Sequence, residues 1–410
     1  MSDFHSLGLS EPLMRALVPL GYETPTPIQA QAIPHVMDGK DVLGVAQTGT
    51  GKTAAFSLPM LHRLGKQPRR EGRRVIRALI LSPTRELSAQ IGESIRDYSQ
   101  HQKLYHTVIF GGVKQGKQVA ALQRGVDIVV ATPGRLLDLI DQGYIRLDHL
   151  EYFVLDEADT MLDMGFIHDI RKVIQLLPPR RQSLFFSATM PQNIQELADT
   201  ILLDPVTVEV ERRSSAAETV EQKVYFVRQA EKKHLLVDVL QAPDVTSALV
   251  FTRTKYGADK VVRHLKRNKI KSEAIHGNKT QPQRDRAMKA FRAGELNILI
   301  ATDIASRGID VTGVSHVINF EIPNISETYV HRIGRTGRAG ASGVAWSLVN
   351  EADERKYMED IQCLMDREVP VIEDHPWHNG MEDIPLHRGR GTRSNESNKG
   401  GGGQRSSDGK

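Results

Sequence analysis

The residues best suited to chemistry lie in one octapeptide, Ala-Gln-Thr-Gly-Thr-Gly-Lys-Thr, at residues 46–53. Gly49 and Gly51 allow the backbone to turn tightly, so that its N–H groups can point at phosphate oxygens. Lys52 adds a positive charge near the β- and γ-phosphates, and Thr53 offers a hydroxyl to Mg²⁺. An apolar run before the octapeptide predicts a strand and the segment after it a helix, so the ligand we predict is a nucleoside triphosphate. Because the octapeptide begins with alanine where the strict pattern has glycine, a glycine-rich connection without a ligand is the alternative.

Two carboxylates follow a second apolar run, Tyr152–Leu155, in the sequence Asp-Glu-Ala-Asp. Asp156 would hold the metal, directly or through water, and Glu157 would orient or deprotonate an attacking water. An isolated acidic tetrapeptide is usually a solvated turn. This one is predicted to emerge at the same sheet edge as Lys52, which favours the chemical interpretation.

Gln29 ends the segment Pro-Thr-Pro-Ile-Gln, in which two prolines restrict the backbone. A glutamine amide held in this way offers a donor and an acceptor to one edge of a base, and adenine fits that pairing. The alternative is a surface turn with an incidental glutamine.

Arg335 and Arg338 lie in the segment 331–338, whose arginines have no acidic neighbours in the sequence. We interpret them as guanidinium groups offered to a phosphate from outside the first domain, as arginine fingers. An exposed basic segment is the alternative.

These motifs follow predicted strands that alternate with helices, which is typical of a doubly wound parallel sheet whose ligands gather at the carboxyl ends of the strands. The alternation occurs twice. The predicted strands are 42–45, 78–82, 107–110, 127–131, 152–155 and 183–186 in the first half, then 223–227, 248–252, 272–275, 297–301, 316–320 and 343–349. A helix is predicted over 351–367. We predict a first domain over 1–208, a linker over 209–218, a second domain over 219–370 and a disordered tail over 371–410.

The bulk composition agrees with two globular domains: 410 residues, 40% hydrophobic and 25% charged. A single cysteine, Cys363, excludes an intrachain disulfide, and no apolar run has the length of about 18 residues that a membrane span needs. The first residues lack the features of a signal peptide, which indicates a cytoplasmic protein with no membrane partner.

The end of the chain is rich in glycine, serine and asparagine, and it is basic after Leu386. Such a composition cannot bury a core and predicts disorder. The functional interpretation is a nonspecific nucleic-acid tether, and the alternative is a solubilising terminus. Its six basic residues are Arg388, Arg390, Arg393, Lys399, Arg405 and Lys410.

Taken together, the motifs over about residues 1–370 resemble those of a DEAD-box RNA helicase, closest to the bacterial RhlE-like branch. The resemblance implies two tandem RecA-like domains, with ATP and Mg²⁺ as cofactors and RNA as partner. It also implies precursor particles of the ribosome or RNA-decay proteins as further partners. The motifs are Phe4 with Gly21, Pro25–Gln29, Ala46–Thr53, Pro83–Leu87, Gly111-Gly112, Thr132–Arg135, Asp156–Asp159, Ser187–Thr189, Phe251–Thr254, Gln281 with Arg284, Ala301–Asp310 and His331–Arg338.

The resemblance also implies a role for each matching residue. The residues that would bind the nucleotide are Phe4, Tyr22, Gln29, Thr48, Gly49, Gly51, Lys52, Thr53 and Asp310. The residues that would hold Mg²⁺ are Thr53 and Asp156. Catalysis falls to Glu157, Lys52, Arg335 and Arg338, and coupling of nucleotide state to strand separation to Ser187 and Thr189. Contacts to the RNA backbone, which position RNA without specifying its sequence, fall to Thr84, Arg85, Gly112, Thr132, Arg135, Arg253 and Thr302.

The mechanism that we expect is a clamp of two domains. ATP and RNA jointly close the clamp, and closure bends one strand of an RNA duplex. Hydrolysis of ATP then opens the clamp again. Two other functions use similar motifs. An ATP-controlled clamp would hold RNA without unwinding it, and a translocase of the wider superfamily would act on DNA. Selection of RNA depends on 2′-hydroxyl contacts, which the sequence does not locate.

Overall fold

Short buried apolar runs form two sheets in this computed structural model, which describes residues 3–47, 49–66, 74–210, 220–306, 311, 313–337 and 343–378. The first sheet contains β1 (Val42–Val45), β2 (Ala78–Leu81), β3 (His106–Ile109), β4 (Ile128–Ala131), β5 (Tyr152–Leu155), β6 (Gln182–Ser187) and β7 (Val206–Glu209). The second contains β8 (Val220–Phe226), β9 (Ala248–Thr252), β10 (Glu273–Ile275), β11 (Ile298–Thr302), β12 (His316–Asn319) and β13 (Gly343–Val349).

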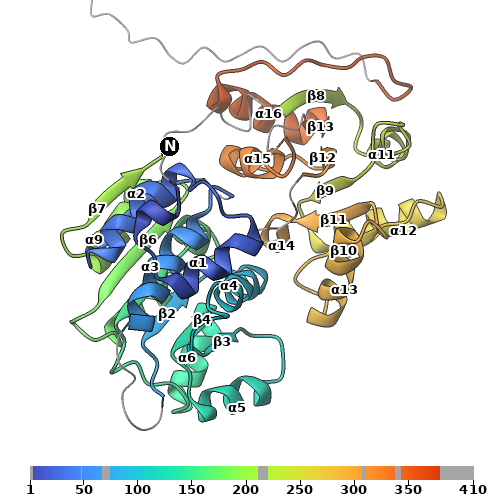
Figure 1. Ribbon diagram of the computed structural model, residues 1–410. Helices are drawn as coiled ribbons and strands as arrows, with labels where there is room; N and C mark the ends of the chain where they lie inside the picture. Colours follow the sequence, from blue (N-terminus) through green and yellow to red (C-terminus); the bar gives the residue numbers. More distant parts are fainter. Residues whose placement is uncertain are drawn as a thin grey trace, which may run out of the picture.

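Both sheets are parallel throughout, with the orders β3-β4-β2-β5-β6-β1-β7 and β10-β11-β9-β12-β13-β8 (Figure 1). Parallel sheets occur with both faces covered, which explains why inner strands such as β2, β4 and β5 are buried along their whole length. The doubly wound architecture predicted from the sequence is confirmed. Each domain is therefore an α/β layer structure with its own core.

Helices cover the two sheets. The first domain has α1 (Glu11–Leu17), α2 (Pro27–Met37), α3 (Lys52–Lys66), α4 (Arg85–Tyr98), α5 (Gly116–Arg124), α6 (Pro133–Asp141), α7 (Ala158–Asp163), α8 (Ile167–Gln175) and α9 (Gln192–Ile201), with the 3₁₀ turns η1 (His5–Leu7) and η2 (Val18–Leu20). The second has α11 (Lys232–Leu240), α12 (Lys255–Arg267), α13 (Gln281–Arg292), α14 (Asp303–Ser306), α15 (Ser326–Ile333) and α16 (Glu351–Met365).

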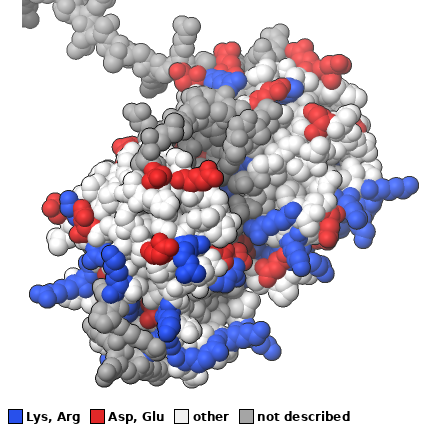
Figure 2. All heavy atoms as spheres, viewed as in Figure 1, with Lys and Arg blue, Asp and Glu red and all other residues white. Residues whose placement is uncertain are grey.

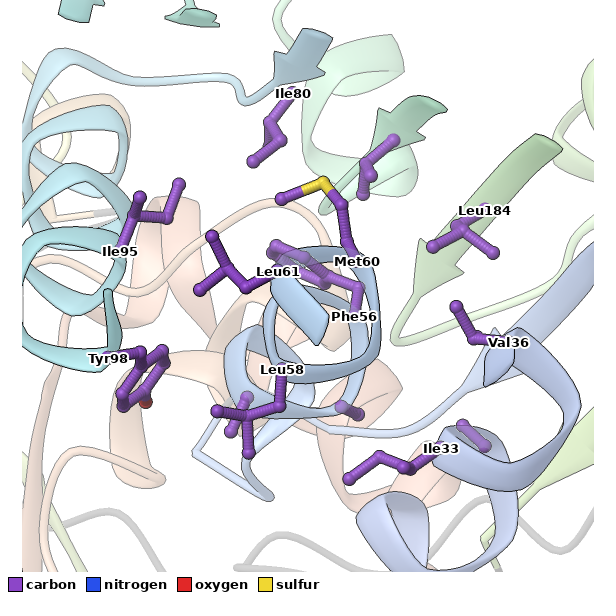
Figure 3. Packing of buried hydrophobic residues seen from close by; sticks show 14 of the residues in the cluster. Ile33, Val36, Phe56, Leu58, Met60, Leu61, Ile80, Ile95, Tyr98 and Leu184 are labelled. Carbon is purple, nitrogen blue, oxygen red and sulfur yellow. The ribbon is translucent and has the colours of Figure 1, made fainter. Parts of the chain in front are cut away.

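The central helix α3 fixes the phosphate loop to the first core (Figure 3). Its Phe56 and Leu61 are fully buried and pack with Ile33 of α2, Ile95 of α4 and Leu184 of β6. Burying a side chain of this size stabilises a fold by roughly 1.5–3 kcal/mol. The start of α3, where Lys52 lies, is therefore held by strong packing.

The described residues differ from two of the predicted domain boundaries. Strand β7, which we had not predicted, pairs with β1 as the edge of the first sheet, so this domain extends beyond residue 208 into the predicted linker. Residues 371–378, which we assigned to the tail, pack on the second domain. Val371 forms a β-bridge to Val224 of the edge strand β8, and His378 forms one to Val227, which directly follows this strand. Residues 211–219 and 379–410, where the rest of the linker and tail predictions fall, lie outside the described residues. No helix of the described chain has the length and apolar character for crossing a membrane.

Candidate active site

The register of the first sheet aligns the carboxyl ends of its strands. Leu81 of β2 pairs with Ala131 of β4 and with Leu155 of β5, while Val45 of β1 pairs with Ser187 of β6. The segments that follow these strands therefore emerge along one edge. They are the phosphate loop, Ser82–Arg85, Thr132–Arg135, Asp156–Asp159 and Ser187–Thr189.

The phosphate loop is closed around its own lysine. Lys52 is 6% exposed, and its Nζ donates to the carbonyl of Ala46 at 2.8 Å. Gly51 has a φ of +94°, and a Cβ there would lie 2.2 Å from Gln29 Nε2, so the loop requires glycine at this point. Thr53, half-buried, is the second residue of α3. Thr48, also predicted to bind nucleotide, lies outside the described residues.

Gln29 connects the proline-containing segment to this loop. It lies in the first turn of α2, where its Oε1 accepts from the backbone N–H of Thr26 at 3.0 Å, as part of a capping box. Its Nε2 donates to the carbonyl of Gly51 at 3.2 Å. The sequence predicted only base recognition, whereas the structure gives Gln29 a positioning contact to the phosphate loop.

Of the two aromatic residues predicted at the nucleotide, Phe4 lies in the core and Tyr22 packs against it, partly buried. Phe4 is 1% exposed and contacts the edge of the Tyr22 ring, with 5.5 Å between ring centroids. The Tyr22 hydroxyl lies 2.6 Å from that of Tyr98 in α4. Direct contact of Phe4 and Tyr22 with a nucleotide stays a prediction.

Asp156 and Glu157 are both buried at the end of β5. Burial raises the pKa of Asp156 to about 7; the charge of Lys52 opposes this effect and that of Glu157 adds to it. Glu157 has a left-handed backbone, with φ 52° and ψ 54°, a conformation that costs a non-glycine residue about 1–3 kcal/mol and is concentrated at functional sites. Its N–H donates to Asp156 Oδ1 at 3.0 Å.

The residues present fit a magnesium ion. Burial penalises the ionised form of Asp156, and a divalent cation would favour that form. Carboxylate and hydroxyl oxygens, here of Asp156 and Thr53, are ligands that Mg²⁺ prefers. When bound with a nucleotide, the ion would neutralise phosphate charge.

Asp159, to which the sequence gave no role, joins two motifs. Its Oδ2 accepts from the backbone N–H groups of Ala188 and Thr189, both at 3.1 Å, and from Thr189 Oγ1 at 3.2 Å. Ser187 Oγ accepts from the N–H of Asp159 at 3.3 Å and donates to the carbonyl of Thr189 at 2.8 Å. The predicted coupling residues are thus bonded to the acidic motif directly.

The predicted RNA contacts of the first domain also lie together. Gly112, with φ +75°, leaves room for Arg85, because a Cβ there would lie 2.2 Å from the guanidinium. Arg135 donates to the carbonyl of Val113 at 3.4 Å, and Thr132 precedes α6 as its N-cap residue. Thr84 caps α4 by accepting from the N–H of Leu87 at 3.2 Å.

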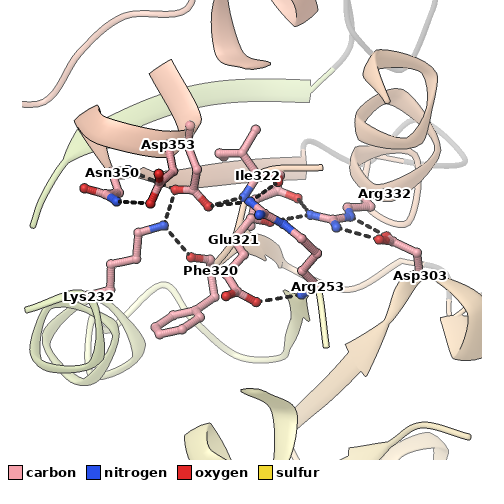
Figure 4. A network of polar contacts seen from close by, with 11 residues as sticks. Lys232, Arg253, Asp303, Phe320, Glu321, Ile322, Arg332, Asn350 and Asp353 are labelled. Atoms are coloured by element: carbon pink, nitrogen blue, oxygen red, sulfur yellow. Dashed lines mark hydrogen bonds and ion pairs between the residues drawn. The ribbon is translucent and has the colours of Figure 1, made fainter. Parts of the chain in front are cut away.

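In the second domain, arginines that look alike in the sequence differ in their surroundings (Figure 4). Arg332 is 2% exposed and forms two bonds with Asp303, at 2.6 and 2.8 Å, which makes it structural. Arg335 follows α15 and is 8% exposed, and Thr302 ends β11. Arg253 remains 40% exposed although Glu354 holds it at 3.2 Å. Arg338 and Asp310 lie outside the described residues.

The two domains meet through α4 and α13. Arg284 Nη2 lies 3.0 Å from Glu86 Oε1, and both side chains are about nine-tenths buried, at 10% and 11% exposure. Beside this ion pair, Gln281 donates to Glu86 at 3.2 Å and accepts from Arg85 at 3.4 Å. Glu86, Gln281 and Arg284 had no predicted role, because only the fold brings them together.

Sequence comparisons agree with this arrangement. A model of the DEAD/DEAH box helicase family matches residues 26–197, and a model of the helicase conserved C-terminal domain matches residues 231–340. RNA helicase CrhR of Synechocystis is 44% identical over 371 residues, which cover 90% of this chain and 74% of the relative. The chain belongs to the DEAD-box RNA helicase family. This DEAD-box protein is also 40% identical to the DEAD-box ATP-dependent RNA helicase CshA of Bacillus cereus, over 91% of its length and 71% of the relative.

A solved structure supports the same assignment for this DEAD-box protein. Dbp5 of S. cerevisiae, bound to RNA and ADP BeF3, superimposes with a TM-score of 0.80 at 31% identity, covering 91% of this chain and 96% of the other. The two domains are therefore RecA-like helicase domains. As a DEAD-box helicase, the chain is an enzyme of the RNA-dependent ATPase class.

Proposed function

We propose that the protein hydrolyses ATP to separate short RNA duplexes with little sequence preference, and that ATP and RNA together close its two domains. The ion pair between Glu86 and Arg284 carries this proposal. It connects α4, which begins at the RNA candidates Thr84 and Arg85, to α13 of the other domain. A ligand that contacts this edge can thereby alter how the domains meet.

For hydrolysis, Lys52 and Thr53 would hold the phosphates, and Asp156 and Thr53 the magnesium ion. Glu157, which the strained backbone directs from the end of β5, would orient the attacking water or accept its proton. Arg335 and Arg338 would stabilise the transferred phosphoryl group from the second domain. Gln29 would read adenine while keeping its contact to Gly51.

Coupling would run through Asp159. Its carboxylate is bonded to the segment Ser187–Thr189 and lies two residues from Glu157. A shift of Glu157 on hydrolysis of the nucleotide would therefore be passed through Asp159 and its hydrogen bonds to the segment Ser187–Thr189. Candidate contacts on that edge, Arg85 and Gly112 among them, would hold the RNA backbone, which explains action without sequence preference.

We also place the chain in the bacterial RhlE-like branch and propose ribosomal precursor particles or RNA-decay proteins as its partners. These finer assignments rest on the sequence resemblance alone.

The test is ATP hydrolysis without nucleic acid, with RNA and with DNA, followed by unwinding of a short RNA duplex. We expect stimulation by RNA only, and unwinding that requires ATP. Stimulation without unwinding would support a clamp that holds RNA, and equal stimulation by DNA would support a DNA translocase. Either result would contradict the proposed function.

A further inference from the structure

Helix α12 carries a line of positive charge that the proposed function does not use. Lys260, Arg263 and Arg267 follow Tyr256 at intervals of four, three and four residues, so all four side chains lie on one face of the helix. All four are exposed, and Tyr256 is 72% exposed. In Figure 2, Lys and Arg side chains gather at the right of the molecule, where Figure 1 places α12. We call these four residues the α12 stripe.

The charge of this region is scarcely compensated. Residues 255–271 contain seven Lys or Arg residues and one carboxylate, Asp259. That carboxylate already contacts Lys279 Nζ at 2.9 Å and His276 Nε2 at 3.1 Å. A favourable interaction with the negative end of the helix dipole accounts for cations of the last turn only, because the effect decays within one turn. Lys260 and Arg263 lie further back.

The stripe begins where the candidate RNA contacts of the second domain lie. Thr254 caps α12, accepting from the N–H of Gly257 at 3.0 Å, and directly follows Arg253 at the end of β9. In the sheet, Thr252 pairs with Thr302 of β11. From this edge the helix runs about 20 Å to its other end, so the stripe leads away from the sheet edge over the surface of the domain.

We propose that the α12 stripe is an auxiliary binding track for a single strand of RNA, in which Tyr256 stacks on a base and the three cations contact phosphates. An exposed aromatic ring followed by a line of cations matches the chemistry of single-stranded nucleic acid, whose bases stack and whose phosphates repeat. Six nucleotides are enough to cover the helix even at the compact spacing of a stacked strand, about 3.4 Å per phosphate along its axis. The inference rests on the proposed function, since RNA must first occupy the neighbouring edge.

The experiment replaces the three cations together, as Lys260→Gln, Arg263→Gln and Arg267→Gln, in the full chain. The matched control replaces three exposed cations of the first domain, as Arg171→Gln, Lys172→Gln and Arg180→Gln. Affinity is measured against salt concentration for a short RNA and for one about six nucleotides longer. Each single-strand phosphate contact contributes about 0.7 to the slope of log affinity against log salt. We expect a loss of about 2 in slope with the longer RNA, no change with the short RNA, and no change in the control.

A second variant tests the stacking. Tyr256→Ala should weaken binding of the longer RNA by about fivefold or more, and Tyr256→Phe should restore it, because stacking needs the ring and not the hydroxyl. The hydrolysis rate at saturating RNA should stay that of the unmodified protein in all of these variants.

Two outcomes overturn the inference. One is an equal slope in the stripe and control variants, which would leave an acidic protein as the partner to consider. The other is an equal loss of affinity for the short and the longer RNA in the stripe variant, which would mean that the three cations bind RNA at the sheet edge itself. Failure of the proposed function would be seen in a different measurement, because the unmodified protein would then show no RNA-stimulated hydrolysis of ATP.

Discussion

At the scale of single residues, the geometry of Glu157 is the most informative feature of the candidate active site. A left-handed glutamate persists only where the surrounding structure holds it, and here the bond from its N–H to Asp156 does so. The strained backbone is explained if the Glu157 carboxylate must face the position of the attacking water.

Glu157→Gln should therefore leave ATP binding within a few-fold of normal and lower the rate of hydrolysis by about 10²-fold or more, because the amide keeps the shape but cannot accept a proton. Single-turnover hydrolysis and nucleotide binding measure the two effects. Glu196→Gln, an exposed change on α9, is the control. Rapid release of RNA from the Glu157→Gln variant in the presence of ATP would count against both the role of Glu157 and the clamp cycle.

Much of this residue-scale description was accessible from the sequence, because the octapeptide and the Asp-Glu-Ala-Asp motif carry their chemistry in consecutive residues. Asp159 was not, since its role depends on bonds to a segment about thirty residues away. Arg332 and Arg335 show the same limit. Burial and the bond to Asp303 make Arg332 structural, and neither is visible in a run of arginines.

At the scale of elements, the contact between α4 and α13 joins the two domains through a buried ion pair. Replacing one member of a buried charge pair costs about 2–5 kcal/mol, chiefly because the other charge is left unpaired. Glu86→Arg and Arg284→Glu should each lower RNA-stimulated hydrolysis by more than about tenfold, and the double exchange should recover part of the loss. Exchanging the exposed pair Arg96 and Asp97 is the control. Additive losses in the double variant would remove this contact from the mechanism.

The second element-scale feature is a buried carboxylate of α16 that accepts from Lys232, Arg253 and Ile322, all three labelled in Figure 4. Glu354 is 2% exposed and accepts from Lys232, from Arg253 and from the backbone N–H groups of Ile322 and Asn350. Burial lowers the pKa of Lys232, and the charge of Glu354 opposes that effect.

Removing the charge of Glu354 should destabilise the second domain. We expect Glu354→Gln to lower its free energy of unfolding by about 3–5 kcal/mol, because Lys232 is then a buried cation without a counter-charge. Denaturant titration checks this. Glu359→Gln, which affects a more exposed pair with Arg355, should cost less than about 1 kcal/mol. Similar losses in the two variants would mean that the buried pair contributes little.

The elements that sequence analysis missed share a physical reason. β7 alternates polar and apolar residues at a sheet edge, so it lacks the continuous apolar run of a central strand. The segment around Val371 is ordered by the open edge of β8, a partner that its own residues do not indicate. The cations of α12 are interleaved with buried Val261 and Leu265, so they never form a run of charge.

At the scale of the whole molecule, the basic residues after Leu386 test whether charge remote from the motifs assists RNA binding. Ending the chain after Met381 removes six cations and no motif residue. The hydrolysis rate at saturating RNA should hardly change, while the slope of log affinity against log salt should fall by roughly 1.5 to 2, for two or three lost contacts. Equal salt slopes for the full-length and shortened proteins would mean that the segment is only a solubilising terminus. A large fall in the hydrolysis rate at saturating RNA would mean that the segment contacts the closed domains directly.

The central claim is that ATP and RNA close the same two domains, which requires each ligand to tighten the other by one common factor. The direct measurement is the affinity of the Glu157→Gln variant for RNA with and without ATP, and for ATP with and without RNA. We predict an equal increase in both directions, which Arg284→Glu abolishes. An RNA affinity that is the same with and without ATP would contradict the account.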